Sequence, residues 1–121
     1  MARHYRELIA WQKAMDLAAL AYERSRRLPS EERYGLCSQM QRAAVSVAAN
    51  IAEGHERKAS KEYRRFLSIA SASLAELETH LLLAQRIGYL DSNSLVEPLA
   101  LASEVGKIIR GIERAVHRAT A

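Results

Sequence analysis

Cysteine, proline, glycine and large aromatic residues are scarce in this sequence of 121 residues, which has one Cys, two Pro, five Gly, one Trp and one Phe. A single cysteine has no disulfide partner within its own chain, so Cys37 indicates a reducing compartment, and we expect a cytoplasmic protein. We expect Cys37 to behave as a small buried apolar residue rather than as a reactive thiol.

Long apolar runs are also missing. The most apolar stretch, residues 43–52, is interrupted by Ser46 and Asn50. It is much shorter than the roughly 20 residues that a helix needs to cross a membrane. The N-terminal residues are charged from Arg3 onward and include no apolar segment. We therefore expect neither a transmembrane helix nor a signal peptide.

The residues that are abundant, Ala, Leu, Glu and Arg, all favour helices. Three short segments rich in Gly, Pro and Ser divide the chain into four parts. We expect Ser30, Ser60 and Ser94 to mark helix starts and Gly88 to end the third helix. The sequence predicts a single domain, residues 1–121, with helices at about residues 4–28, 31–56, 60–87 and 93–119.

Apolar residues recur in each part at steps of three and four, the period of an amphipathic helix. In the first part the predicted buried face consists of Leu8, Trp11, Met15, Ala18, Tyr22 and Leu28. In the third part it consists of Tyr63, Phe66, Ala70, Leu74, Leu77, Leu81 and Ala84. Because the connections are short, neighbouring helices should run antiparallel. The expected fold class is all-α, an antiparallel up-down-up-down four-helix bundle.

The formal net charge of +4 is unevenly distributed in this topology. The start of the first helix, the end of the second, the start of the third and the end of the fourth meet at one end of the bundle. Ten basic residues fall at this end against five acidic ones, whereas the opposite end is neutral. The basic residues are Arg3, Arg6, Arg57, Lys58, Lys61, Arg64, Arg65, Arg110, Arg114 and Arg118.

A concentrated basic end is typical of proteins that contact phosphates, which the arginine fork binds with two hydrogen bonds. We hypothesise that this basic end binds nucleic acid, with RNA as the expected partner, and does so without reading base edges. The alternative is a protein-interaction module whose basic surface is only solvated. The candidate binding residues are Arg57, Lys58, Lys61, Arg64, Arg65, Arg110, Arg114 and Arg118.

A polar stripe at helical spacing runs along the second helix and consists of Gln39, Arg42, Ser46, Asn50 and Glu53. Alanines surround it, so another helix could approach closely, and polar side chains can fix the register of such a contact. Residues 81–83 of the third helix are all leucine, which is more apolar surface than one core stripe needs. We therefore expect a homo-oligomer, with a solvent-facing stripe as the alternative.

The sequence shows no catalytic, metal-binding or cofactor-binding pattern, so we expect a protein that is not an enzyme and needs no cofactor. A di-iron bundle requires paired Glu-x-x-His elements, and a zinc site requires several Cys and His ligands. One catalytic alternative stays open. Arg110 and His117 share a helix face, and their spacing resembles the arginine–histidine element of the HEPN helical ribonucleases, in which the histidine performs acid–base chemistry.

A family resemblance is carried by residues 34–54, which read YGLCSQMQRAAVSVAANIAEG. They resemble the signature of the four-helix-bundle proteins encoded in 23S rRNA intervening sequences, and residues 11–14, 66–70 and 88–90 resemble that family too. The family is similar to the accessory variability determinants of diversity-generating retroelements, which form basic pentameric barrels that bind RNA and a reverse transcriptase. The resemblance implies a bacterial cytoplasmic bundle, pentameric and nucleic-acid-binding, with no catalytic residues to carry over.

The residues and the resemblance together predict a non-catalytic, oligomeric scaffold whose basic end binds RNA or DNA. It would act as an accessory to a ribonucleoprotein or a reverse transcriptase. The expected partners are further copies of the chain, nucleic acid and a protein such as a reverse transcriptase, but no membrane.

Overall fold

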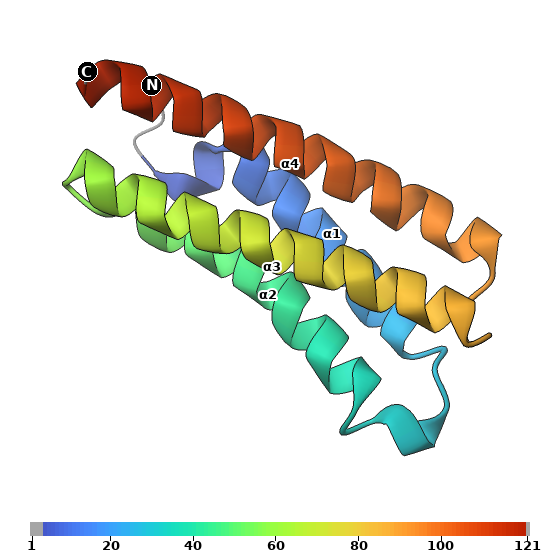
Figure 1. The fold of residues 1–121 in the computed structure, drawn as a ribbon. Coiled ribbons are helices and arrows are strands. Elements are labelled where there is room, and N and C mark those ends of the chain that lie inside the picture. The colour runs from blue at the N-terminus through green and yellow to red at the C-terminus, as the bar shows by residue number, and fades with distance from the viewer. Residues whose placement is uncertain (1–3, 121) are drawn as a thin grey trace.

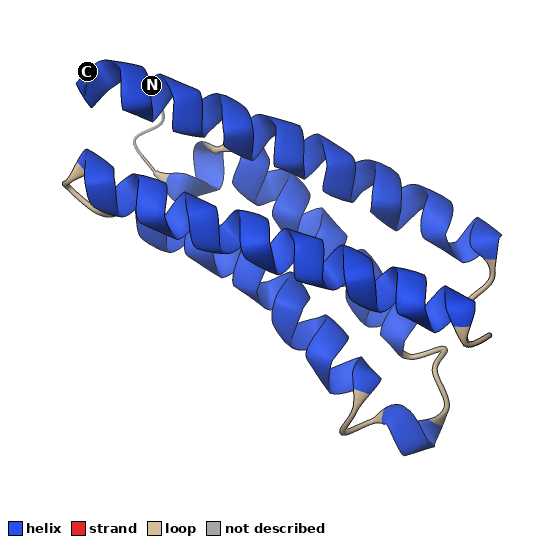
Figure 2. Cartoon of the chain, in the orientation of Figure 1, coloured by secondary structure: helices blue, strands red, loops and turns tan. Residues whose placement is uncertain are grey.

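Four helices make up most of the chain in the computed structural model, which describes residues 4–120. Short 3₁₀ turns at Tyr5–Glu7 and Ser30–Glu32 precede the first and second helices. The described residues contain no strand, so the all-α fold class is confirmed (Figure 2). The helices are α1 (Ile9–Ser25), α2 (Leu36–His55), α3 (Ser60–Arg86) and α4 (Ser92–Thr120).

The helices form the predicted antiparallel up-down-up-down bundle (Figure 1). Each helix packs against two neighbours, in the pairs α1–α2, α2–α3, α3–α4 and α4–α1. The α2–α3 turn, the start of α1 and the end of α4 lie at one end of the bundle, and the other two connections lie at the opposite end (Figure 1). The topology therefore brings the basic residues of the α2–α3 turn, the start of α3 and the end of α4 to a common end.

The core lies between the four helices and is filled mainly by aliphatic side chains of α2, α3 and α4. The predicted face of α3 is confirmed, because its residues from Phe66 to Ala84 are buried and Tyr63 is half-buried. By length and apolar composition alone α3 could cross a membrane. One face of α3 nevertheless lies in the core of the bundle. Its largest fully buried side chains are Leu67, Leu77 and Leu81.

The predicted buried face of α1 is wrong. The residues that α1 places in the core each lie one position earlier and are mostly small: Ala10, Ala14, Leu17 and Ala21. Met15 is 46% exposed, and Trp11 is only half-buried at the edge of the core. Because alanine fills little space, α1 can lie close to its neighbours, while its larger apolar residues cover the seams beside it.

The predicted start of the first helix is wrong, and Ser60, where α3 begins as predicted, does not act as the cap. The first helix begins at Ile9 rather than near residue 4, because Leu8 has an extended backbone that separates the 3₁₀ turn from α1. Residue Arg3 lies outside the described part of the chain. Ser60 is the first residue of α3 rather than its cap, since the cap position is occupied by Ala59, which makes no side-chain cap bond.

The α1–α2 connection is longer than predicted, because α1 ends at Ser25 rather than near residue 28 and α2 begins at Leu36 rather than residue 31. Ser30 starts a 3₁₀ turn and caps nothing. The Glu32 carboxylate instead accepts a hydrogen bond from the Leu36 N–H at 3.2 Å, which satisfies one unpaired donor at the start of α2.

Cys37, next to this connection, is half-buried, and its Sγ–H donates to the carbonyl oxygen of Ser25 at 3.2 Å. Burial, together with the negative charge of Glu32, raises the pKa of the Cys37 thiol. The cysteine therefore stays protonated at neutral pH, in agreement with a structural rather than a reactive role.

At the α3–α4 connection, specific residues end α3 and begin α4. Gly88 has φ of +87°, and its position after the end of α3 confirms it as the predicted stop. The start of α4 is capped by Asp91 rather than by Ser94. The Asp91 carboxylate accepts hydrogen bonds from the Ser94 N–H at 2.8 Å and the Ser94 hydroxyl at 2.6 Å. These bonds, the hydroxyl's first, lower the pKa of Asp91 below its ordinary value.

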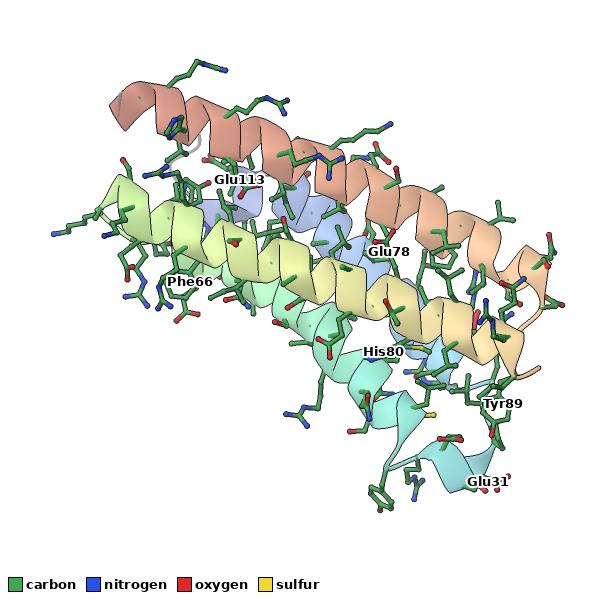
Figure 3. All side chains as sticks on the ribbon, in the orientation of Figure 1. Glu31, Phe66, Glu78, His80, Tyr89 and Glu113 are labelled. Atoms are coloured by element: carbon green, nitrogen blue, oxygen red, sulfur yellow. The ribbon has the colours of Figure 1, made fainter. Side chains whose placement is uncertain are left out.

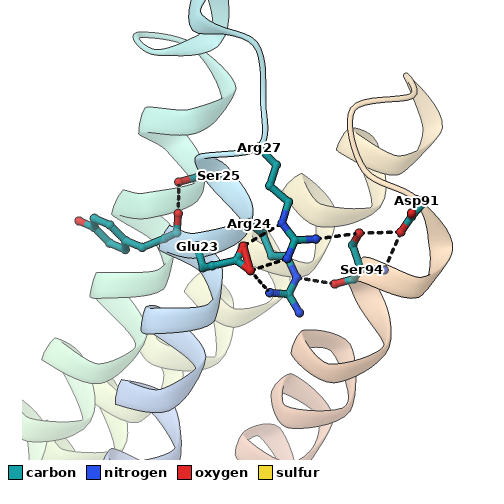
Figure 4. Close-up of polar contacts among 7 residues, drawn as sticks. Glu23, Arg24, Ser25, Arg27, Asp91 and Ser94 are labelled. Carbon is teal, nitrogen blue, oxygen red and sulfur yellow. Dashed lines mark hydrogen bonds and ion pairs between the residues drawn. The ribbon is translucent and has the colours of Figure 1, made fainter.

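Pro98 lies inside α4 and cannot donate the helical hydrogen bond to the carbonyl of Ser94. The buried Arg24 of α1 supplies the missing donor, since its Nε lies 2.7 Å from the Ser94 oxygen (Figure 4). Arg24 also donates to Glu23 at 2.7 Å, and Arg27 donates to the same carboxylate. An arginine network therefore locks α1 to α4 at the neutral end of the bundle.

Candidate nucleic-acid interface

The basic end is built around a tight α2–α3 turn. Gly54 near the end of α2 is buried, and a Cβ added there would lie 2.8 Å from Phe66 Cβ and 3.1 Å from Tyr63 Cδ1. Only glycine permits this approach of α2 to α3. The close contact places the exposed cations Arg57, Lys58 and Lys61 at the turn that joins the two helices.

Most of the predicted binding residues are exposed at this end. Arg57, Lys58, Lys61 and Arg65 surround the turn, and Arg118 lies in the last turns of α4. Arg57 pairs with Glu53 and Arg65 pairs with Glu62, each at 3.3 Å. These exposed pairs are weak and leave the guanidinium groups accessible to a phosphate.

Phe66 is an element of this surface that the sequence analysis assigned only to the core. It lies on the α2 side of α3 (Figure 3) and is 7% exposed. The Cζ atoms of Arg57 and Arg65 lie 4.8 Å and 5.1 Å from the centroid of its ring. Cation–π attraction to this ring therefore holds the two guanidinium groups beside the α2–α3 turn.

The other aromatic rings at the basic end contact protein groups. Tyr63 lies edge-on to His55 at a centroid distance of 6.0 Å, and burial raises the pKa of its hydroxyl. Tyr5 packs against Trp11 at 5.3 Å. Base stacking on exposed rings is therefore not the mode that this surface favours, whereas contacts to phosphates remain accessible.

A second group of predicted residues lies on the α4 side of α3. Arg64 of α3 and Arg110, Arg114 and His117 of α4 line an open groove of about 480 Å³, together with Glu113. Figure 3 places Glu113 between the two helices at this end of the bundle. The structure therefore divides the predicted arginines into two clusters, one around the turn and one in the groove.

Arg110 and His117 do share a face of α4, as predicted, but His117 is held by a third residue. Arg64 Nη1 lies 2.8 Å from His117 Nδ1. A guanidinium has only donors, so Nδ1 must accept this bond, and the neutral ring carries its proton on Nε2. In that state the ring has no lone pair left with which to remove a proton, which weakens the ribonuclease interpretation.

The polar stripe of α2 divides between internal and surface contacts. Ser46 Oγ lies 2.7 Å from Ser73 Oγ of α3, and the Asn50 amide donates to the Ser46 carbonyl at 2.8 Å. The Ser46–Ser73 contact joins α2 to α3 within one chain, and Asn50 bonds to Ser46 within α2. Gln39, Arg42 and Ser46 line a shallow hollow of about 440 Å³, and Glu53 is exposed and pairs with Arg57, so part of the stripe is accessible to another molecule.

A buried histidine on α3 was not singled out by the sequence analysis. His80 is 7% exposed, and its Nδ1 has no hydrogen-bond partner among the described residues. Its Nε2 lies 4.0 Å from a carboxylate oxygen of Glu76. Within residues 4–120 no cluster of three His, Cys, Asp or Glu side chains is arranged to hold a metal ion.

The fold and the basic end define a class of protein, a small antiparallel four-helix bundle with its positive charge concentrated at one end. Residues 6–111 match the family described as 23S rRNA-intervening sequence protein, and the chain belongs to this family. The match covers all four helices up to Gly111 of α4, including the α2–α3 turn and Arg110.

A solved structure shares the fold. It is a protein of unknown function from the S23 ribosomal protein family of Bacteroides thetaiotaomicron, with 22% identity and a TM-score of 0.80. The alignment covers 87% of this chain and 98% of that chain. No curated protein matches the sequence.

Proposed function

We propose that this protein is a non-catalytic scaffold whose basic end binds nucleic acid, RNA in particular, through phosphate contacts. The observation that carries the proposal is the convergence of cations from the α2–α3 turn, α3 and α4 on one end of the bundle. Those around the α2–α3 turn are exposed, and two of them are held in place on the ring of Phe66. Membership of a family named for 23S rRNA intervening sequences agrees with RNA as the partner.

The proposal is tested by titrating a labelled structured RNA and a matched DNA duplex with the wild type and two triple variants. The first variant carries Lys58→Gln, Lys61→Gln and Arg118→Gln at the basic end. The second carries Arg26→Gln, Arg33→Gln and Arg86→Gln at the neutral end. All six side chains are exposed, and each variant removes three positive charges.

We expect the first variant to lose about tenfold or more in RNA affinity at low salt, because phosphate contacts add together. The second variant should bind almost as well as the wild type. Equal losses in both variants would show that only net charge matters, and an absence of binding by the wild type would leave the protein-interaction module as the better account.

We also propose that the protein works as a homo-oligomer in the cytoplasm. Apolar side chains on α3 support this: Leu82 and Leu83 are 48% and 44% exposed, and Ile87 is 49% exposed. The resemblance to accessory variability determinants suggests a pentamer and a reverse transcriptase as partner. Light scattering of the wild type and of a Leu82→Gln, Leu83→Gln variant tests this proposal. We expect the mass of an oligomer for the wild type and a smaller mass for the variant. The mass of a monomer for the wild type would reject the proposal.

A further inference from the structure

The groove between α3 and α4 is separate from the surface around the α2–α3 turn. Its three arginines come from both helices: Arg64 from α3, and Arg110 and Arg114 from α4. Glu113 is its one carboxylate, so the groove carries a formal excess of two positive charges when His117 is neutral. None of the three arginines forms an ion pair within the described residues, so their charge is not cancelled internally.

Arg64 is held in a way that an exposed surface arginine is not. It is half-buried, its Nη1 donates to His117, and its Nε is buried without a hydrogen-bond partner among the described residues. An unpaired buried donor costs free energy, and the cost is higher for a charged group. An acceptor that reached this Nε together with the outer guanidinium nitrogens would remove this cost.

The backbone of α4 is adapted to the arginines as well. Gly106 lies inside α4, where glycine is less favourable than alanine. A Cβ at this position would lie 3.3 Å from Arg110 Nη1 and 3.3 Å from Leu74 Cδ2. The missing side chain therefore gives the Arg110 guanidinium room to lie along α4 toward Gly106, so Arg110 adds charge at the edge of the groove away from Arg64.

Apart from the Glu113 carboxylate, the polar groups that this groove offers are mainly hydrogen-bond donors with positive charge. We propose that it binds one phosphoryl group, with Arg64 and Arg114 as its ligands. The inference deepens the proposed function, on which it rests, by assigning a discrete phosphate site within the basic end. Arginine forks match the tetrahedral oxygens of phosphate, and a volume of about 480 Å³ admits such a group.

The direct test is isothermal titration of the full chain with inorganic pyrophosphate, using four proteins. Arg64→Gln should weaken binding by about tenfold, because it removes a charge-assisted hydrogen bond. Arg86→Gln, an exposed arginine at the other end of the same helix, should bind like the wild type. Glu113→Gln should bind several-fold more tightly, since it removes the carboxylate that opposes the anion, and a gain cannot arise from misfolding.

Binding of RNA oligonucleotides with a 5′-phosphate or a 5′-hydroxyl, measured in parallel, separates the sources of the phosphoryl group. A preference for the 5′-phosphate that Arg64→Gln abolishes identifies a terminal phosphate, and equal affinities lost in Arg64→Gln identify a backbone phosphate. If RNA binds but Arg64→Gln and Glu113→Gln change neither titration, the groove site is overturned and the proposed function stands. If pyrophosphate binds and RNA does not, the groove site stands and the proposed function fails.

Discussion

At the scale of single residues, Gly54 sets the geometry of the basic end. The distance of 2.8 Å from its added Cβ to Phe66 Cβ cannot be relieved by rotating a side chain, because Phe66 Cβ is fixed to the backbone of α3. The Gly54→Ala variant should therefore be destabilised by about 1–3 kcal/mol. Thermal or urea unfolding measures the change.

Gly111 provides the matched control for this prediction. It also lies inside a helix, but a Cβ added there meets only Arg114 Nη2, at 4.0 Å. The Gly111→Ala variant should be stabilised by about 0.5–1 kcal/mol, because alanine has the better helix propensity. If Gly54→Ala stabilised the protein as Gly111→Ala should, the close approach of α2 and α3 at Gly54 would be contradicted.

His80 is a second residue whose replacement is informative, because it tests whether the buried ring makes a stabilising polar contact. A buried ring nitrogen without a partner costs stability, so His80→Leu should raise the free energy of unfolding by about 1 kcal/mol. Chemical denaturation is the measurement. A loss of stability would mean that the ring makes a polar contact that matters, for example with Glu76 across 4.0 Å.

At the scale of elements, Arg24 and Pro98 should act as a coupled pair. Arg24→Met leaves the Ser94 carbonyl without its donor and should cost about 2 kcal/mol. In a Pro98→Ala background the new N–H of residue 98 can donate to the same carbonyl, so the cost should fall below about 1 kcal/mol. A double-mutant cycle by urea unfolding measures the coupling; purely additive losses would show that Arg24 does not replace the missing helical bond.

The start of α4 should respond to acid. The pKa of Asp91 is lowered in the folded protein, so its contribution is complete above its ordinary pKa of 3.8 and is lost as the pH falls through the lowered value. Asp91→Ala should lower Tm by a few degrees at pH 7, and the difference from the wild type should shrink as the pH approaches 3. A difference that does not shrink at all as the pH falls below 3.8 would assign the effect to packing rather than to the charged cap.

The amphipathic period predicted most of the elements because large apolar residues mark the buried faces of α2, α3 and α4. It failed for α1, where the core positions are mainly alanines such as Ala10 and Ala14. Alanine carries little apolar signal, and only packing against the neighbouring helices decides which face of α1 is buried. The predicted serine caps failed for a similar reason, since Glu32 and Asp91 accept the hydrogen bonds at the starts of α2 and α4 through contacts that a serine pattern does not reveal.

At the scale of the whole molecule, the topology was sufficient to predict that the cations of the α2–α3 turn, α3 and α4 share one end. It could not predict their division into two clusters, because that depends on how each helix is rotated about its axis. The rotation of α3 places Phe66 beside Arg57 and Arg65, and it places Arg64 in the groove next to His117. Side-chain pairs of this kind come from packing and leave no local signal in the sequence.

The central claim is that exposed cations at this end contact phosphates, and the salt dependence of RNA binding tests it most directly. The slope of log affinity against log salt counts released counterions at about 0.7 for each contact to a single strand. Removing Lys58, Lys61 and Arg118 as above should therefore reduce the magnitude of the slope by about 2, while the triple variant of Arg26, Arg33 and Arg86 keeps the slope of the wild type. Equal slopes for all three proteins would contradict the account, because the basic end would then make no phosphate contacts of its own.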